Sequence, residues 1–250
     1  MTMKKQLLIF SLFFCSYALS VQADPPELPA YDNAEYRENE AAFNAIGLNK
    51  AYTGKDNEAY SGFSGLGVTV AVVDGGTMTT HADLKNKTSL LYNYFYNLAG
   101  TDHGTHVSGI IAAEKNGTDT NPGGMHGVAY NASYLPFSVR LTDGCNEDGC
   151  PEWFDVWEML ATEPYDDIKI VNNSWGIEEI PSANLSGTLK YVKMLVAKDK
   201  LIIAAAGNET KMFPNELPAG IGAKDSTLKN NIISVVAYDP KLTPANPKFI

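Results

Sequence analysis

The sequence predicts an α/β domain with a mostly parallel sheet and helices on both faces. Three observations support this class. Short β-branched apolar runs recur along the chain, stretches with helical apolar spacing lie between them, and the 250 residues are enough for one large domain. Nearly continuous apolar runs are typical of strands that helices cover on both sides. The runs are residues 68–73, 134–139, 168–171, 201–206 and 232–237.

The first 23 residues have the composition of a signal peptide. Lys4 and Lys5 form a positive start, an apolar core runs from Leu7 to Leu19, and residues 21–23 form a small-residue cleavage site. We therefore expect the mature chain to begin near Asp24 and the protein to be secreted or placed on the cell surface. An N-terminal membrane anchor is the alternative, although the apolar core is short for a span.

An extended leader and a helix are expected before the first strand. Residues 24–35 are rich in proline and acidic groups, and the glycine- and serine-rich run 52–67 is predicted to be a surface loop. Residues 38–50 have helical spacing, with one side formed by Ala41, Ala42, Ala45 and Ile46. The chain thus divides into a signal peptide (1–23), a leader (24–35) and a domain (36–250).

The strand at 68–73 leads into the segments that carry most of the polar chemistry. Asp74 closes this strand, and two glycines follow it. Residues 102–113 then change from a loop into a helix, and His103 stands at its start, where a titratable side chain faces outward as a general base must. The buried stripe of this helix is predicted to be Val107, Ile110 and Ile111.

The second half of the chain continues the alternation of strands and helices, which predicts a parallel sheet. Two further amphipathic helices are expected. Their apolar positions are Phe154, Val156, Trp157 and Leu160 in the first, and Leu189, Val192, Leu195 and Val196 in the second.

Polar residues follow three of the predicted strands at the point where each strand ends. These residues are Asp74, Ser174 and Asn208. Because sites in open parallel sheets form outside the carboxyl ends of the strands, we expect the three residues to share one edge, with His103 joining them from its helix. Asp74 taken alone is also an ordinary turn residue, and Asn208 an ordinary cap after a strand.

Residues 102–109, Asp-His-Gly-Thr-His-Val-Ser-Gly, resemble the histidine motif of the subtilisin-like serine proteases. The block from Val70 to Gly76 and the block from Ala204 to Asn208 resemble two further motifs of that family, and the resemblance covers roughly residues 35–250. It departs at Gly75 and Thr77, where a small polar and an aliphatic residue are usual. The resemblance implies that His103 is the catalytic base, that Asp74 orients it, and that Asn208 donates to the oxyanion.

The same resemblance implies that polypeptides are the substrates. Residues 174–176 (Ser174, Trp175 and Gly176) resemble the segment to which an extended peptide adds by backbone hydrogen bonds. Together with residues 204–207, which include Ala205 and Gly207, this segment is expected to wall the primary specificity pocket. Glu209 at its rim hints at a basic or polar substrate side chain. Trp175 has a second interpretation, a buried aromatic that plugs the end of the sheet.

The nucleophile of the family is absent from these 250 residues. No Gly-Thr-Ser-Met-Ala-like segment occurs, and neither Ser226 in a polar loop nor Ser234 inside a strand fits its place. The chain is therefore predicted to be the first part of a protease domain, without its C-terminal part and inactive alone. The alternative is a catalytically silent module that binds extended peptides or a partner. The start of the first helix is similar to autotransporter subtilisins, in which a C-terminal β-barrel follows the protease.

Cysteine and histidine usage is more typical of a disulfide than of a metal site. Cys145 and Cys150 lie in one turn-rich loop, and two nearby cysteines in an exported protein predict a local disulfide. A zinc site needs four ligands. His103 and His106 with Asp74 form only a weak metal pattern, and His81 and His126 are expected in loops. No cofactor is required for the chemistry; structural calcium is possible, and the acidic loop 143–148 is a candidate region.

The net charge of -10 argues against a nucleic-acid partner, because phosphate binding needs basic patches. No stretch after the signal is long and apolar enough to span a bilayer. A dinucleotide-binding domain is a further alternative, since Asp74 and two glycines follow a strand. It lacks the spaced glycines of that fold and leaves the histidine segment unexplained.

Overall fold

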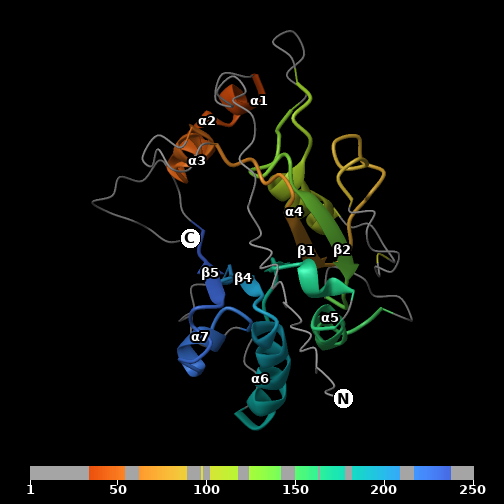
Figure 1. Cartoon of the computed structure of the whole chain (residues 1–250), viewed down its shortest axis with the longest axis vertical. Helices are drawn as coiled ribbons and strands as arrows, with labels where there is room; N and C mark the ends of the chain where they lie inside the picture. The colour runs from red at the N-terminus through yellow and green to blue at the C-terminus, as the bar shows by residue number, and fades with distance from the viewer. Residues whose placement is uncertain are drawn as a thin grey trace, which may run out of the picture.

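A wholly parallel, five-stranded sheet organises the chain (Figure 1). The structure, a computed structural model, describes residues 34–53, 62–88, 97, 102–117, 124–141, 150–162, 164–177, 182–208 and 217–237. The strands are β1 (Thr69–Asp74), β2 (Ser133–Ser138), β3 (Ile170–Asn173), β4 (Leu201–Ala205) and β5 (Ile232–Val235), in the spatial order β2-β1-β3-β4-β5. The predicted α/β class with a parallel sheet is confirmed.

The strand order reverses direction at β1. The chain passes from β1 to β2 on one side and returns to β3 on the other, so Val72 pairs with Pro136 and with Asn172. Pro136 is tolerated because β2 is an edge strand, where a missing backbone donor costs little. In open parallel sheets, the crevice outside the carboxyl ends of the strands at such a reversal is where sites form. Asp74 is the last residue of β1 and stands at that point.

Helices cover the two faces of the sheet around β1. Ala71 and Val73 point into a core shared with α5 (Trp153–Leu160) and α6 (Ser182–Ala197), whereas Val70 and Val72 pack toward α4 (Asp102–Ala112). Figure 1 shows α4 on the opposite side of the strands from α5 and α6. Each fully buried large side chain in these cores, such as that of Trp157, contributes about 1.5–3 kcal/mol.

The remaining elements differ from the sequence expectation mainly at their ends. β3 begins two residues later than predicted, because its residues pair with β1 on one side and β4 on the other. A short 3-10 helix, η2 (Tyr165–Asp167), precedes it, and α7 (Ile221–Lys224), which the sequence did not predict, precedes β5.

The buried stripe of α4 is not the predicted one. Its buried positions are Gly104, Ser108 and Ala112, one helical turn apart, whereas Ile110 is 40% exposed and Val107 and Ile111 are half-buried. The reason is proximity: a Cβ on Gly104 would lie 2.0 Å from the carbonyl oxygen of Gly76. Only the smallest side chains fit against the loop that follows β1, whereas Val107 and Ile111 pack, partly buried, against the core around Val70 and Val72.

The predicted helix at 38–50 is three short helices. They are α1 (Ala34–Glu38), α2 (Glu40–Ala45) and α3 (Leu48–Thr53), so helix already begins inside the range predicted as extended leader. Gly47, at φ +71°, turns the chain between α2 and α3. The predicted alanine face is also wrong: Ala41, Ala42, Ala45 and Ile46 are exposed. The aromatic side chains dominate instead, and those that are buried are Tyr36, Phe43 and Tyr52.

These aromatic rings enclose His126. The ring of Phe43 stacks on His126 with centroids 5.2 Å apart, and Tyr36, Tyr52 and Tyr130 lie within 6.3 Å. Because a carbonyl only accepts, Nδ1–H of His126 donates to the Gly127 oxygen (2.8 Å), and burial lowers the pKa of the ring. Gly127 N in turn donates to Ala113 O at the end of α4. The N-terminal helices are thereby anchored to the segment that follows α4.

Several predicted features lie outside the described residues. The signal peptide falls in residues 1–33, and Cys145 and the candidate calcium loop 143–148 fall in residues 142–149. Cys150 is disulfide-bonded, but its pairing with Cys145 stays a prediction.

Two glycines of α4 provide a test of this close packing. Gly104→Ala should lower the free energy of unfolding by about 1–3 kcal/mol, because the new methyl group meets backbone that cannot move aside. Gly109→Ala, where nothing lies within 4 Å, should raise it by about 0.5–1 kcal/mol. Urea unfolding of the two variants measures the difference. Equal effects of both substitutions would contradict the packing described.

Candidate active site

The side chains of Asp74 and His103 are in direct contact. Nδ1 of His103 lies 2.9 Å from Oδ1 of Asp74, with the carboxylate at the end of β1 and the imidazole in the first turn of α4. The Asp74 side chain is 1% exposed and the His103 side chain 55% exposed. The structure thus joins a buried carboxylate to a solvent-facing ring, 29 residues apart in the sequence.

The contact fixes the tautomer of His103. A carboxylate oxygen only accepts hydrogen bonds, so Nδ1 of His103 carries the proton and donates it to Asp74. Nε2 is left as the basic nitrogen on the exposed part of the ring. Oδ1 of Asp74 also accepts from Gly75 N at 2.7 Å, whereas Oδ2 is buried without a hydrogen-bond partner among the described residues. This arrangement suits a base that takes a proton from a nucleophile.

Hydroxyl groups join the loop after β1 to α4. Thr77 Oγ1 lies 2.8 Å from Ser108 Oγ and donates to Gly104 O at 3.2 Å, while Met78 N donates to Thr105 Oγ1 at 2.8 Å. These bonds hold residues 75–78 against the first turns of the helix that carries His103. In the linear motif, Thr77 is only a departure from the family pattern, because its partner lies 31 residues away in the sequence.

Trp175 lies in the core. Its side chain is buried among the rings of Trp153 and Trp157, and its indole N–H donates to the Val73 carbonyl at 2.8 Å. This agrees with the second of its two interpretations, an aromatic that plugs the end of the sheet. With the side chain buried, Trp175 could contact a substrate only through its backbone, and its role as a substrate-binding residue stays a prediction.

The other predicted site residues follow β3 and β4 at the same edge. The register pairs Val73 with Asn173 and Asn173 with Ala204, so the ends of β1, β3 and β4 lie side by side. Past these ends, Ser174 is half-buried and accepts from Asn172 Nδ2 at 3.0 Å, and Gly176 and Asn208 are exposed. The last residues of the edge are Ala205, paired with Val235, and Gly207, at φ +98°. Glu209 lies outside the described residues.

Metal ligands are not gathered at this edge. Within the described part of the chain, no group of three or more His, Cys, Asp and Glu side chains is placed to hold a metal ion. His106 is exposed on α4 and does not share the contact of His103 with Asp74.

Comparisons with known proteins give a consistent picture. Residues 65–246 match the family model described as the subtilase family. The chain is 31% identical over 191 residues to an extracellular serine protease of Serratia marcescens, covering 70% of this chain and 16% of that protein. It is 36% identical over 156 residues to the major intracellular serine protease of Bacillus subtilis strain 168, covering 59% of this chain and 45% of that protein. The chain therefore spans less than half the length of these two relatives.

A solved structure supports the same fold. The S41 psychrophilic protease superposes with a TM-score of 0.55 at 26% identity, covering 82% of this chain and 63% of that one. The parallel sheet and its helices are thus shared with known proteases.

Replacing Asp74 with Asn tests the tautomer of His103. The amide of Asp74→Asn donates where the carboxylate accepted, so the proton of the ring should move from Nδ1 to Nε2. In ¹⁵N spectra of selectively labelled histidine, the two ring-nitrogen shifts of His103 should exchange. Asp102→Asn, next to His103 but not bonded to its Nδ1, serves as the control and should leave the shifts in place. If the ring-nitrogen shifts of His103 stayed unchanged in Asp74→Asn, Asp74 would not be the residue that sets the tautomer of His103.

Proposed function

The chain belongs to the subtilase family, and on this premise we propose that it carries the base, the orienting carboxylate and the oxyanion donor of a secreted serine endopeptidase. The observation that carries the proposal is the 2.9 Å contact of His103 Nδ1 with Asp74 at the carboxyl edge of the sheet. The fold, the family and the proteases among its relatives support the same reaction.

In the proposed reaction, Nε2 of His103 takes the proton of a serine hydroxyl as that oxygen attacks the peptide carbonyl. Asp74 keeps the proton on Nδ1 and stabilises the imidazolium that forms. The side-chain amide of Asn208 donates to the oxyanion of the tetrahedral intermediate. His103 then returns its proton to the leaving amine, and water repeats the cycle on the acyl-enzyme.

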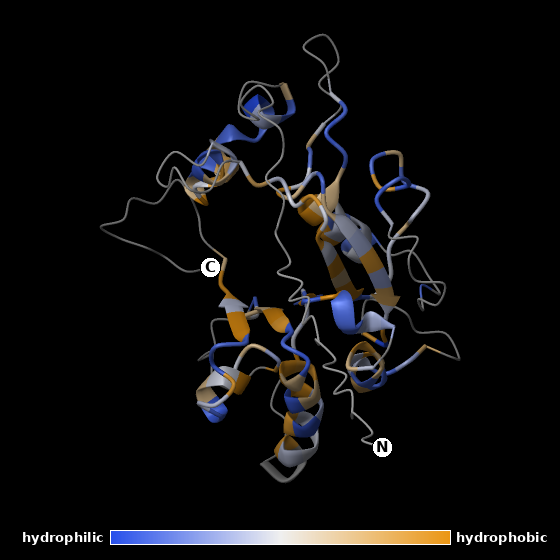
Figure 2. Cartoon of the chain, in the orientation of Figure 1, coloured by the Kyte–Doolittle hydropathy of each residue, from blue (hydrophilic) through white to orange (hydrophobic). Residues whose placement is uncertain are grey.

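The serine is proposed to lie beyond residue 250. An apolar surface at β4 and β5 supports this: Ile233 and Val235 are 48% and 51% exposed, and Ile203 is half-buried. Figure 2 shows hydrophobic colouring on both strands. These side chains lie on the face of the sheet that α4 covers at β1 and β2. A further segment that covered this face would stand next to α4 and could present a nucleophile to His103.

A catalytically silent module is the second candidate function. Its supporting observation is that no serine hydroxyl of the described residues is hydrogen-bonded to the His103 ring. Such a module would bind extended polypeptides along residues 174–176 and 205–207 without cleaving them.

Export is part of the proposal. The positive start and apolar core of residues 1–23 support it, as does the similarity to extracellular proteases of Serratia marcescens. In the residues that the structure describes, no helix has the length and apolar character needed to cross a bilayer. An autotransporter arrangement also remains our proposal, because residues 39–42 are similar to a segment of autotransporter subtilisins.

We also propose a structural calcium site at Glu35. Its side chain is buried, Oε1 accepts from Gly117 N at 2.8 Å, and Oε2 is buried without a hydrogen-bond partner among the described residues. Burial raises the pKa of Glu35, and the nearby charge of Asp83 raises it further. Calcium takes carboxylate and carbonyl oxygens, so an ion shared by Glu35 and Asp83 would relieve both costs. Calcium would supply stability here and no chemical step.

An active-site label tests the protease assignment. A biotinylated organophosphonate should modify the chain when it is prolonged by its natural downstream sequence, and His103→Ala should abolish the modification because the serine is no longer activated. Ser226→Ala, in an exposed loop, should label as strongly as the parent. Full labelling of His103→Ala would refute the triad, and no labelling of the prolonged parent would favour the silent module.

Calcium titration tests the role of Glu35. Calcium should raise the melting temperature of the 250-residue chain by several degrees, since a ligand that binds only the folded state stabilises it. Glu35→Gln, which mimics the protonated acid, should lose this response, and Glu38→Gln, an exposed neighbour on α1, should keep it. A calcium response that survives Glu35→Gln would place the ion elsewhere.

A further inference from the structure

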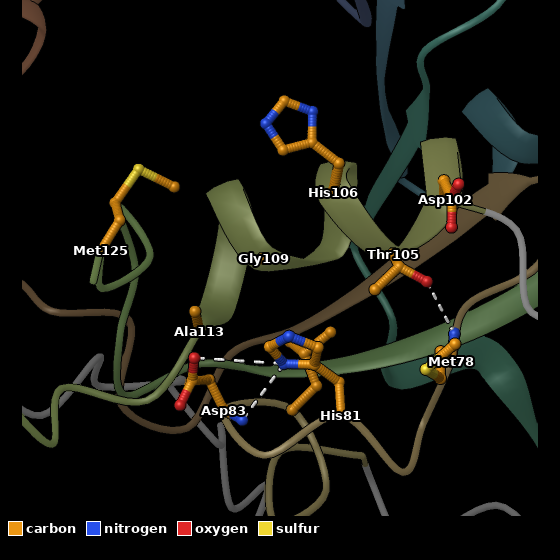
Figure 3. Close-up of a pocket in the computed structure, with 10 residues that line it drawn as sticks. Met78, His81, Asp83, Asp102, Thr105, His106, Gly109, Ala113 and Met125 are labelled. Atoms are coloured by element: carbon orange, nitrogen blue, oxygen red, sulfur yellow. Dashed lines mark hydrogen bonds and ion pairs between the residues drawn. The ribbon is translucent and has the colours of Figure 1, made fainter. Parts of the chain in front are cut away.

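A pocket of about 320 Å³ lies beside the helix that carries His103. It is formed by the outer side of α4, the loop after β1 and the segment after α4, and its volume is in the range of pockets that hold a small ligand or one side chain. Figure 3 shows Met125 at one end and Met78 with Asp102 at the other. Neither the proposed mechanism nor the predicted substrate segments use this pocket.

The floor and ends of the pocket are apolar and adaptable. Leu84 and Ala113 are buried and line it, and Gly109 of α4, where an added Cβ would meet nothing within 4 Å, lines it as well. Met78 and Met125 contribute unbranched thioether side chains, which adjust to irregular ligands. Apolar walls of this kind suit an unbranched aliphatic chain.

Two carboxylates, those of Asp83 and Asp102, line the pocket together with two histidines, His81 and His106. Asp102 is exposed in the first turn of α4, and its carboxylate stands at the end of the pocket where Met78 lies. Asp83 is already engaged: its Oδ1 accepts from Asn116 Nδ2 at 3.0 Å, its Oδ2 lies 4.0 Å from His81 Nδ1, and it is the carboxylate proposed above to share calcium. Asp102 is therefore the carboxylate left for a ligand in the pocket. With a net charge of -10 on the whole chain, the surroundings favour a cationic ligand.

The pocket and the proposed active site share a wall. Asp102 directly precedes His103, and the Met78–Thr105 hydrogen bond, 2.8 Å long, holds two pocket-lining residues together at the loop that follows Asp74. When a polypeptide lies along His103, one of its side chains, some positions away from the bond that is cut, could therefore enter this pocket.

We propose that the pocket binds a lysine or arginine side chain of the polypeptide substrate. The aliphatic stem would lie on Leu84 and the two methionines, and the charged head would reach Asp102. This secondary site would add a preference for basic residues away from the scissile bond. That the ligand is part of a substrate rests on the proposed function, but the binding of a basic side chain in this pocket needs no nucleophile.

Methyl NMR of the 250-residue chain tests the proposal independently of catalysis. With ¹³C-methyl methionine, the acetylated and amidated tripeptide Ala-Lys-Ala should shift the signals of Met78 and Met125, which Met78→Leu and Met125→Leu identify. The same tripeptide with norleucine in place of lysine keeps the stem and loses the charge, so it should bind about fivefold more weakly, as expected for one partly exposed ion pair.

Asp102→Asn should remove the preference for lysine over norleucine. Asp167→Asn, at an exposed acid in η2, should retain it. Equal affinity of the two peptides for the parent would overturn the proposal, as would a lysine preference that survives Asp102→Asn or shifts that spare both methionines. Because no bond is cleaved, a failure here is distinct from a failure of phosphonate labelling.

Discussion

The contact between the buried carboxylate of Asp74 and the ring of His103 depends on how closely α4 approaches the end of β1. A carboxylate that is 1% exposed is costly to bury unless donors reach it, and here Gly75 N and His103 Nδ1–H both do. His103 can reach because Gly104 has no side chain between the helix and Gly76. The hydroxyl pair of Thr77 and Ser108 then holds that short distance. A substitution that moved α4 outward would cost stability and chemistry together.

The far end of the same helix is held by different forces. Aromatic rings from α1–α3 enclose His126, and the next residue, Gly127, donates a backbone hydrogen bond to Ala113 at the end of α4. Glu35 adds a buried carboxylate that bonds to the next loop at Gly117. The N-terminal helices, which alone are too short to be stable, thus gain their structure from packing and in return fix the segment after α4.

The sheet is covered unevenly, and this bears on what the chain can do. Around β1 both faces are packed, which gives the proposed base and its carboxylate a rigid support. At β4 and β5 one face exposes Ile233 and Val235, next to the edge where Asn208 stands. The part of the sheet that is packed on both faces therefore holds Asp74 and His103, which are in contact. The part with one exposed face is where the nucleophile is proposed to lie.

The sequence by itself determined the strands, the parallel class and the residues at the strand ends, because apolar runs and turn residues are local signals that the sheet only assembles. Asp74 and His103 were predicted as partners from motifs, and the structure brings them into contact. Only the tertiary structure decided which faces are buried. On α4, Gly104 and Ser108 are buried and Ile110, which was predicted to be buried, is exposed. In the N-terminal helices, Phe43 and Tyr52 are buried instead of the predicted alanines of residues 38–50. Periodicity in the sequence shows which residues share a face of a helix. Which face is buried depends on how closely the neighbouring backbone approaches, as at α4, and on which large aromatic side chains can fill the space, as at α1–α3.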